Sequence, residues 1–141
     1  MSIEILYLMF CASCVVLGEI FEFYVRFSWG DDMLHVFSGS FITVIGFVIL
    51  YYLNEKKEVP MQLSPGFVVL FCFCFSLAAE CVWEAFEYAM DFLVGSNTQR
   101  YMDNYTSEPF LGRHALKDTM GDVLQAILGS IIFCIIGYIA T

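Results

Sequence analysis

Long apolar runs separated by polar segments dominate the chain. Four such runs cover about residues 3–29, 32–53, 67–94 and 116–139. Each is long enough for a helix that crosses a bilayer, which needs about 20 mainly apolar residues. The polar segments between them allow consecutive helices to run antiparallel. The pattern therefore predicts one all-α integral membrane domain over residues 1–141, a polytopic bundle of four antiparallel transmembrane helices.

Acidic residues interrupt the third apolar run with a helical spacing. The stretch ECVWEAFEYAMD carries Glu80, Glu84, Glu87 and Asp91 at positions i, i+4, i+7 and i+11. On a helix this spacing places all four side chains on one face. Acids inside a membrane helix are costly and usually functional. We interpret Asp91 as a surface position where the helix leaves the membrane. Glu87 can be such a position too. Glu80 and Glu84 lie deeper in the apolar run, and we interpret them as part of a candidate site.

Polar residues also occupy one end of each of the other runs. In an antiparallel bundle of four helices, the end of the first and third helices meets the start of the second and fourth. The intramembrane acids and the histidine all fall at these four ends, so we expect them to converge near one membrane surface. They are Glu19, Glu22, Asp31, Asp32, His35, Glu80, Glu84, Glu87, Asp118 and Asp122.

This convergence predicts a pocket that holds a divalent metal ion. So many carboxylates cannot all stay ionised in a low dielectric unless cations neutralise them. Carboxylate oxygens suit Mg, Mn or Ca, and an added imidazole also admits Zn or Fe, so the identity of the metal stays open. Glu80 or Glu19 would then be free to act as a catalytic base. The expected ligands are Asp31, His35, Glu84, Glu87, Asp118 and Asp122.

Each of these residues also has a structural interpretation. His35 can be a hydrogen-bonded histidine packed near a helix start. Either Asp31 or Asp32 can cap the second helix, and Asp118 can cap the fourth, because Asp accepts hydrogen bonds from the free N–H groups of a first turn. Asp122 lies one turn inside its helix and is harder to explain as a cap.

Composition and charge narrow the classes of partner. The chain is 60% hydrophobic, above the roughly half that is usual for soluble domains, and we expect a multi-pass protein of the cell membrane in contact with lipid. Its net charge of -9 and only 6 Lys and Arg argue against nucleic-acid binding, which needs basic contacts to phosphates. The 6 cysteines all lie in apolar runs, which argues against a secreted disulfide framework.

Three short motifs occur in a fixed order. They are Asp31 with His35 four residues later and an apolar pair after it, WEAFEY at 83–88, and DTMGD at 118–122. This arrangement resembles the YjdF-like family of small bacterial inner-membrane proteins and, more loosely, VanZ-like proteins. The resemblance implies a location in the bacterial inner membrane. It singles out the same residues that we expect as metal ligands.

Three functions are consistent with such a pocket. The first is a metal-dependent enzyme that acts on a lipid or lipid-linked substrate, with the metal activating water or polarising a phosphoryl oxygen. The second is a cation or proton transporter or channel that uses the same acids. The third is a non-catalytic membrane subunit. The opposite helix ends offer only Cys, Ser and Gly, which favours a blind pocket over a transport path. The pattern leaves the substrate, the topology and the oligomeric state open.

Overall fold

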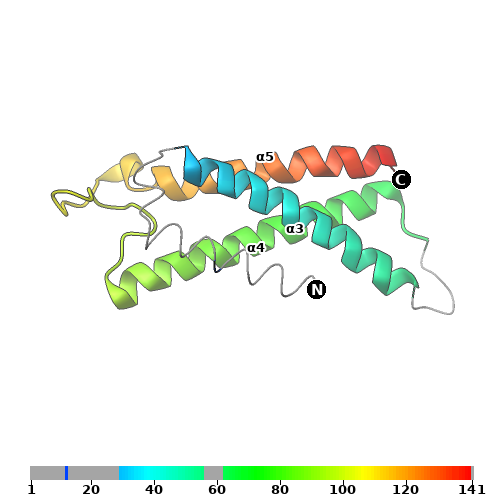
Figure 1. Cartoon of the computed structure of the whole chain (residues 1–141), viewed down its shortest axis with the longest axis horizontal. Helices are drawn as coiled ribbons and strands as arrows, with labels where there is room; N and C mark the ends of the chain where they lie inside the picture. The colour runs from blue at the N-terminus through cyan, green and yellow to red at the C-terminus, as the bar shows by residue number, and fades with distance from the viewer. Residues whose placement is uncertain (1–11, 13–28, 56–61, 141) are drawn as a thin grey trace.

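Three long helices make up the body of the protein. The computed structural model describes residues 12, 29–55 and 62–140. The helices are α3 (Gly30–Glu55), α4 (Pro65–Val94) and α5 (Lys117–Ala140), and a short 3-10 turn, η2 (Gly112–His114), precedes α5. Figure 1 shows that α3 and α5 begin, and α4 ends, at the same end of the bundle. Each long helix is long and apolar enough to cross a membrane.

The prediction of a four-transmembrane-helix bundle is wrong. The part of the chain that the structure describes forms three candidate spans, not four. The predicted span 3–29 and its Glu19 lie outside the described residues, except for positions 12 and 29. In addition, α3, α4 and α5 each contact the other two and already enclose a common interior.

Local signals set the ends of these helices. Pro65 lies in the first turn of α4, and the Ser64 side chain caps that turn by accepting a hydrogen bond from the backbone N–H of Phe67. The helix ends at Gly95, whose φ of 73° is left-handed, and the Gly95 N–H donates to the carbonyl of Asp91 at 3.1 Å. These caps explain why α4 ends where the sequence predicts it and begins slightly earlier.

The helices approach one another through small residues. A Cβ added at Gly39 of α3 would collide with the backbone of Ala126 in α5, and one added at Gly129 would collide with the carbonyl of Val36. The backbones of α3 and α5 are therefore in direct contact, as is common between membrane helices with small residues at the interface. Gly46 allows a similar approach to α4, where a Cβ would meet Cys72 at 3.2 Å.

Hydroxyl groups link the helices in the middle of the bundle. Thr43 of α3 donates to the hydroxyl of Ser130 in α5 at 2.8 Å, and Ser76 of α4 donates to the carbonyl of Gly39 at 3.0 Å. Thr43, Ser76 and Ser130 are almost completely buried. Such bonds hold membrane helices together where water is absent.

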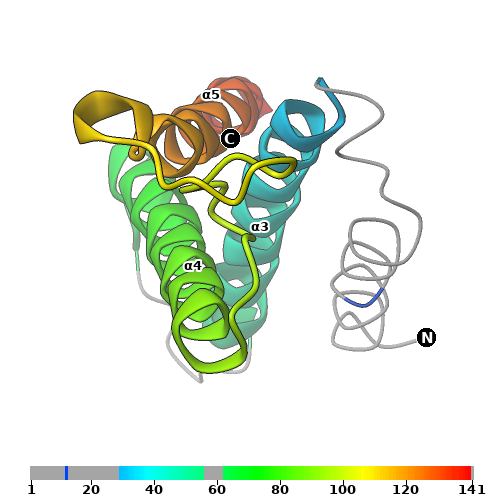
Figure 2. The same ribbon diagram turned by 90° about the vertical axis from the view of Figure 1, so that its left-hand side faces the viewer.

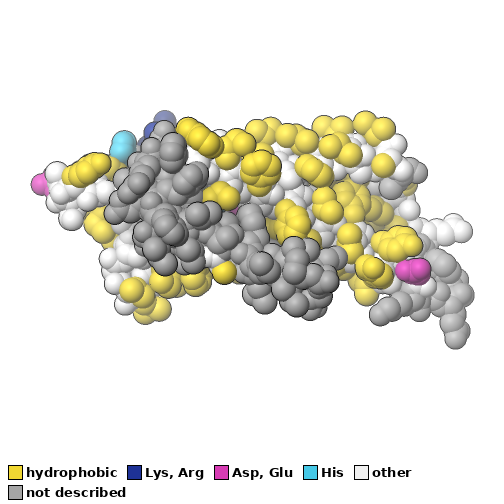
Figure 3. Space-filling view, viewed as in Figure 1, with side chains coloured by type: hydrophobic (Ala, Val, Ile, Leu, Met, Phe, Trp, Pro, Cys, Tyr) yellow, Lys and Arg dark blue, Asp and Glu magenta, His cyan; other side chains and the backbone are white. Residues whose placement is uncertain are grey.

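Large apolar side chains cover the outside of the bundle. Figure 3 shows them spread along the visible face of the described helices. Leu70, Val82 and Ile139 are each more than half exposed, whereas the buried apolar residues are few and mostly small. A soluble bundle would bury its large apolar side chains, so this distribution is that of a protein whose surroundings are lipid.

The segment between α4 and α5 folds back over the end of the bundle. Figure 2 shows this segment (yellow) crossing the space between the three helices. An isolated β-bridge between Met102 and Pro109 closes a turn in it. Asp103 organises the turn, because the backbone N–H groups of Thr106 and Tyr105 donate to its carboxylate and hold the pKa of Asp103 below its usual value. The part that crosses the bundle, residues 96–100, is called the strap below.

Candidate metal centre

A buried histidine joins α3 to α4 at this end of the bundle. His35 is 7% exposed and Glu80 is 4% exposed. Nδ1 of His35 lies 2.7 Å from Oε1 of Glu80, a short hydrogen bond. With its proton on Nδ1 and directed at Glu80, the ring presents the lone pair of Nε2 on its other side.

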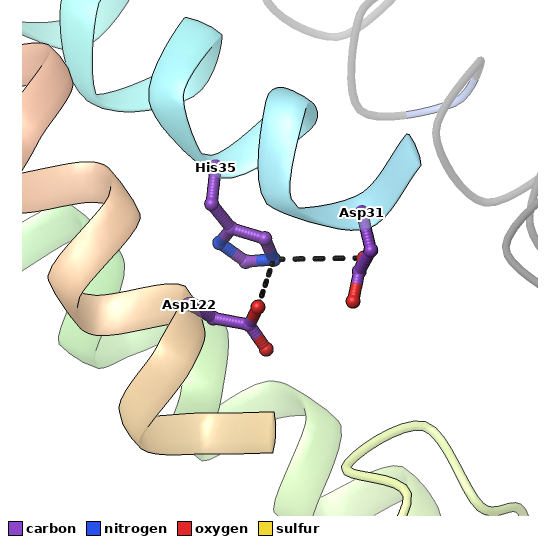
Figure 4. A group of neighbouring side chains, drawn as sticks. All are labelled: Asp31, His35 and Asp122. Atoms are coloured by element: carbon purple, nitrogen blue, oxygen red, sulfur yellow. Dashed lines mark ion pairs between the residues drawn. The ribbon is translucent and has the colours of Figure 1, made fainter. Parts of the chain in front are cut away.

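Two carboxylates face that second nitrogen. Oδ1 of Asp122 lies 3.7 Å and Oδ1 of Asp31 lies 3.9 Å from Nε2 of His35. Figure 4 shows Asp31, from the first turn of α3, and Asp122, from α5, directed at the same ring nitrogen. Asp122 is 3% exposed. Both distances exceed a hydrogen bond, so the three groups surround a small polar space. We call Asp31, His35 and Asp122 the His35 centre.

The dimensions of the His35 centre suit a metal ion. The three ligand atoms lie within 4.8 Å of one another. Two ligands bound tetrahedrally to one ion, each about 2.1 Å from it, are about 3.4 Å apart. The separations of 3.7 and 3.9 Å between Nε2 of His35 and the two carboxylates are only a few tenths of an ångström longer. The hydrogen bond from Nδ1 to Glu80 is the arrangement that orients metal-binding histidines in proteins.

A second group of acids lies beside the His35 centre. Ligand atoms of His35, Glu80 and Glu84 also fall within 4.8 Å of one another. Glu84 is 8% exposed, and its Oε2 accepts a hydrogen bond from the side chain of Gln99 at 3.2 Å. Glu87, one turn further along α4, accepts from the indole N–H of Trp83 at 2.8 Å.

The strap supplies a positive charge to the rim of the acid cluster. Nη2 of Arg100 lies 3.2 Å from Oδ2 of Asp31, and Nη1 lies 3.3 Å from Oδ1 of Asp118. Arg100 therefore bridges α3 and α5. Its backbone has a φ of 44°, a left-handed conformation that is unfavourable for a residue other than glycine.

Asp91 fixes the strap to α4. We expected Asp91 on an ordinary surface, but it is only 9% exposed. Its carboxylate accepts hydrogen bonds from the Ser96 hydroxyl, from the N–H and the hydroxyl of Thr98 and from the N–H of Gln99, at 2.6 to 3.0 Å. Asp91 therefore holds the strap in place over the acids.

The structure distributes the expected ligands over neighbouring positions. Three of them form the His35 centre, and Glu84 lies in the second group. Glu87 accepts a hydrogen bond from Trp83, and Asp118 forms an ion pair with Arg100. The residues that we expected as catalytic bases have other positions. Oε1 of Glu80 is engaged with His35, and Glu19 lies outside the described residues.

Sequence reasoning missed the residues that the strap contributes. Gln99 contacts Glu84 and the hydroxyl of Thr119, and Arg100 contacts acids of two helices. Both lie in a polar loop with no helical period to place them. For Asp91 a signal did exist, because its spacing puts it on the same helical face as Glu80 and Glu84.

Three apolar helices around a buried acid–histidine cluster define an integral membrane protein. Comparison with known sequences gives the family: residues 2–141 match the model of the family described as "Predicted membrane protein (DUF2238)", and the chain belongs to this family. The YjdF-like name that the motifs suggest is not the name of the matched family and stays a resemblance.

One relative is an "Uncharacterized protein" of Thermotoga maritima. It is 30% identical over 115 residues, which are 81% of this chain and 50% of the relative. The chain thus spans about half the length of this curated relative. No solved structure matches the chain.

Proposed function

We propose that the chain is a metal-binding membrane protein in which the His35 centre holds a divalent cation near one membrane surface. The observation that supports this most is the placement of the imidazole. Nδ1 of His35 is hydrogen-bonded to Glu80 at 2.7 Å, while Nε2 of the same ring faces two carboxylate oxygens at 3.7 and 3.9 Å. A buried polar space of this kind is costly in a membrane unless a cation occupies it.

The ligand set limits the metals that fit. One imidazole nitrogen and two carboxylate oxygens suit Zn, Fe or Mn better than Ca or Mg, which prefer oxygen alone. Two of these ligands, His35 and Asp122, are almost completely buried, and Asp31 is only slightly more exposed. The ion would reach the centre from the strap side, where Arg100 and Asp31 are nearest to the surface.

Metal content tests this proposal directly. The full chain is purified in detergent without chelators, and its metals are measured by elemental analysis. We expect at least one equivalent of metal per chain, with one equivalent lost in Asp122→Asn and in Asp31→Asn. Asp32→Asn is the matched control, because Asp32 is the exposed neighbour of Asp31 in the same helical turn. A wild type without metal, or unchanged content in both ligand variants, would contradict the proposal.

We infer further that the ion serves a reaction on a lipid or lipid-linked substrate in the bacterial inner membrane. The centre lies at the end of a lipid-facing bundle, where a headgroup reaches it while the acyl chains stay in the bilayer. When bound, the metal supplies an activated water or a polarised phosphoryl oxygen. Arg100 is placed to bind a phosphate on the same rim, since a guanidinium pairs with phosphate as well as with carboxylate.

Phosphate release from phosphorylated lipids tests this inference. The purified proteins are incubated with a panel of phosphorylated lipids. The wild type and Asp32→Asn should release phosphate from at least one of these lipids, and His35→Ala should release none. Equal release by His35→Ala would contradict a metal-dependent reaction at this centre.

A second candidate function is the transport of a cation or a proton. The hydroxyls of Ser76, Thr43 and Ser130 favour it, because they continue the buried polar surface from the acids into the middle of the bundle. Flux through proteoliposomes that falls in Thr43→Val would support transport over catalysis. A protein with neither flux nor turnover would be a non-catalytic membrane subunit.

A further inference from the structure

Two buried carboxylate oxygens next to the His35 centre have no hydrogen-bond partner. In the part of the chain that the structure describes, these are Oε1 of Glu84 and Oδ2 of Asp118. Glu84 is more than nine-tenths buried. An unsatisfied buried polar atom is destabilising, and more so when it belongs to a charged group. Two such atoms in one cluster indicate a missing positively charged partner.

The two residues lie on facing helices under the strap. Glu84 belongs to α4 and Asp118 to α5, and their carboxylates are close enough for their charges to interact. Gln99 of the strap contacts both helices, with its side-chain amide 3.2 Å from Oε2 of Glu84 and 3.2 Å from the hydroxyl of Thr119. Gln99 therefore links the turn of α4 that carries Glu84 to the first turn of α5, which carries Asp118, and Glu84 itself lies next to His35.

The side chains already paired with these acids do not satisfy the free oxygens. Arg100 binds Oδ1 of Asp118 and leaves Oδ2 without a partner. Gln99 binds Oε2 of Glu84 and leaves Oε1 without one. Each carboxylate thus has one oxygen held by the strap and one that is free to bind a ligand.

The charge of the cluster also exceeds what one ion offsets. The basic groups that face the acids are His35 and Arg100. With all six carboxylates ionised, one divalent cation in the His35 centre leaves an excess of negative charge, and a second cation reduces that excess. The acids are Asp31, Glu80, Glu84, Glu87, Asp118 and Asp122.

We propose that Glu84 and Asp118 hold a second cation, so that the protein binds two cations side by side. The ligands on offer are oxygens only, which suits a hard ion such as Mg²⁺, Mn²⁺ or Ca²⁺. The His35 centre, by contrast, takes an ion that accepts imidazole nitrogen. This proposal rests on the proposed function, because the second cation would lie beside the ion proposed for the His35 centre. Two adjacent cations are an arrangement that stabilises both the attacking and the leaving oxygen in phosphoryl transfer.

Titration with Mn²⁺ tests the number of sites. The chain over residues 1–141, freed of metal and kept in detergent, is titrated with Mn²⁺, and the free ion is counted by its electron paramagnetic resonance signal. The wild type should bind two Mn²⁺ per chain. Glu84→Gln and Asp118→Asn should each bind one, and Asp122→Asn should also bind one. Glu108→Gln, which alters an exposed acid of the loop between α4 and α5, should bind two Mn²⁺ per chain. Size-exclusion profiles and helical circular dichroism show that each variant is folded.

The outcomes separate this proposal from the function proposed above. A wild type that binds one Mn²⁺, lost in Asp122→Asn and kept in Glu84→Gln, overturns the second site and leaves the His35 centre standing. Two ions retained in both Glu84→Gln and Asp118→Asn also overturn it. A wild type that binds no Mn²⁺ and no other divalent ion contradicts both proposals.

Discussion

Nδ1 of His35 and Oε1 of Glu80 lie 2.7 Å apart, although 45 positions separate the two residues in the chain. The bond connects the first turns of α3 to the middle of α4. It also orients the ring so that Nε2 faces Asp31 and Asp122. A single contact therefore joins α3 to α4 and orients the imidazole in the site.

Glu80 should act on metal affinity by orienting His35. We expect Glu80→Gln to weaken metal binding by about 10-fold and Glu80→Ala by up to about 100-fold, the range seen when partners of metal-binding histidines are removed. Isothermal titration with the metal found in the purified protein measures this. Glu108→Gln is the control, as it removes an exposed acid of the loop. Unchanged affinity in Glu80→Ala would show that the contact does not serve the metal.

Arg100 should hold the strap closed. Its two ion pairs are partly exposed, so we expect Arg100→Gln to lower the free energy of unfolding by only about 0.5–1 kcal/mol. Amide hydrogen exchange in residues 96–100 should rise clearly, because the strap loses its contacts with α3 and α5. Arg113→Gln in the exposed 3-10 turn is the matched control. Equal protection of the strap in both variants would mean that Arg100 does not hold it.

Asp91 should be the stronger anchor of the same strap. Its carboxylate accepts four hydrogen bonds, and replacing it leaves those donors unpaired. We expect Asp91→Ala to lower the free energy of unfolding by about 2–3 kcal/mol. Thermal unfolding in detergent measures the loss, with Asp32→Asn as the control for removal of an exposed acid. A smaller loss of stability in Asp91→Ala than in Arg100→Gln would contradict the claim that Asp91 is the stronger anchor.

The close contact between α3 and α5 should tolerate no side chain. Gly39→Ala and Gly129→Ala each place a Cβ against the backbone of the other helix, and we expect losses of about 1–3 kcal/mol. Gly121→Ala is the matched control on α5, because its Cβ would meet nothing within 4 Å. That change should be neutral or stabilise the helix by up to about 1 kcal/mol. Equal unfolding temperatures for all three variants would contradict the packing.

Apolar runs and caps were sufficient to place α3, α4 and α5, because a membrane-spanning helix must be long and apolar throughout. The run before α3 predicted a fourth span, whereas the described part of the chain holds three candidate spans. Helical spacing also predicted that acids gather at one end. The pairing of Glu80 with His35 was beyond the sequence, because it depends on the rotation of α4 against α3.

The strap could not be predicted from periodicity. Arg100 and Gln99 reach the acids only because Asp91 turns the loop back over the bundle. The distance from a loop residue to a helix depends on the turn geometry, here including the left-handed backbone at Arg100. No local pattern of hydrophobic and polar residues records that geometry.

The central claim is that Nε2 of His35 binds a metal ion, and pulsed electron paramagnetic resonance tests it most directly. The full chain is loaded with Mn²⁺ or Cu²⁺, and the coupling of the ion to imidazole nitrogen is recorded. The wild type and His114→Ala, which alters the exposed loop histidine, should both show nitrogen coupling, and His35→Ala should not. A bound ion without nitrogen coupling in the wild type, or the same coupling in His35→Ala, would contradict the claim.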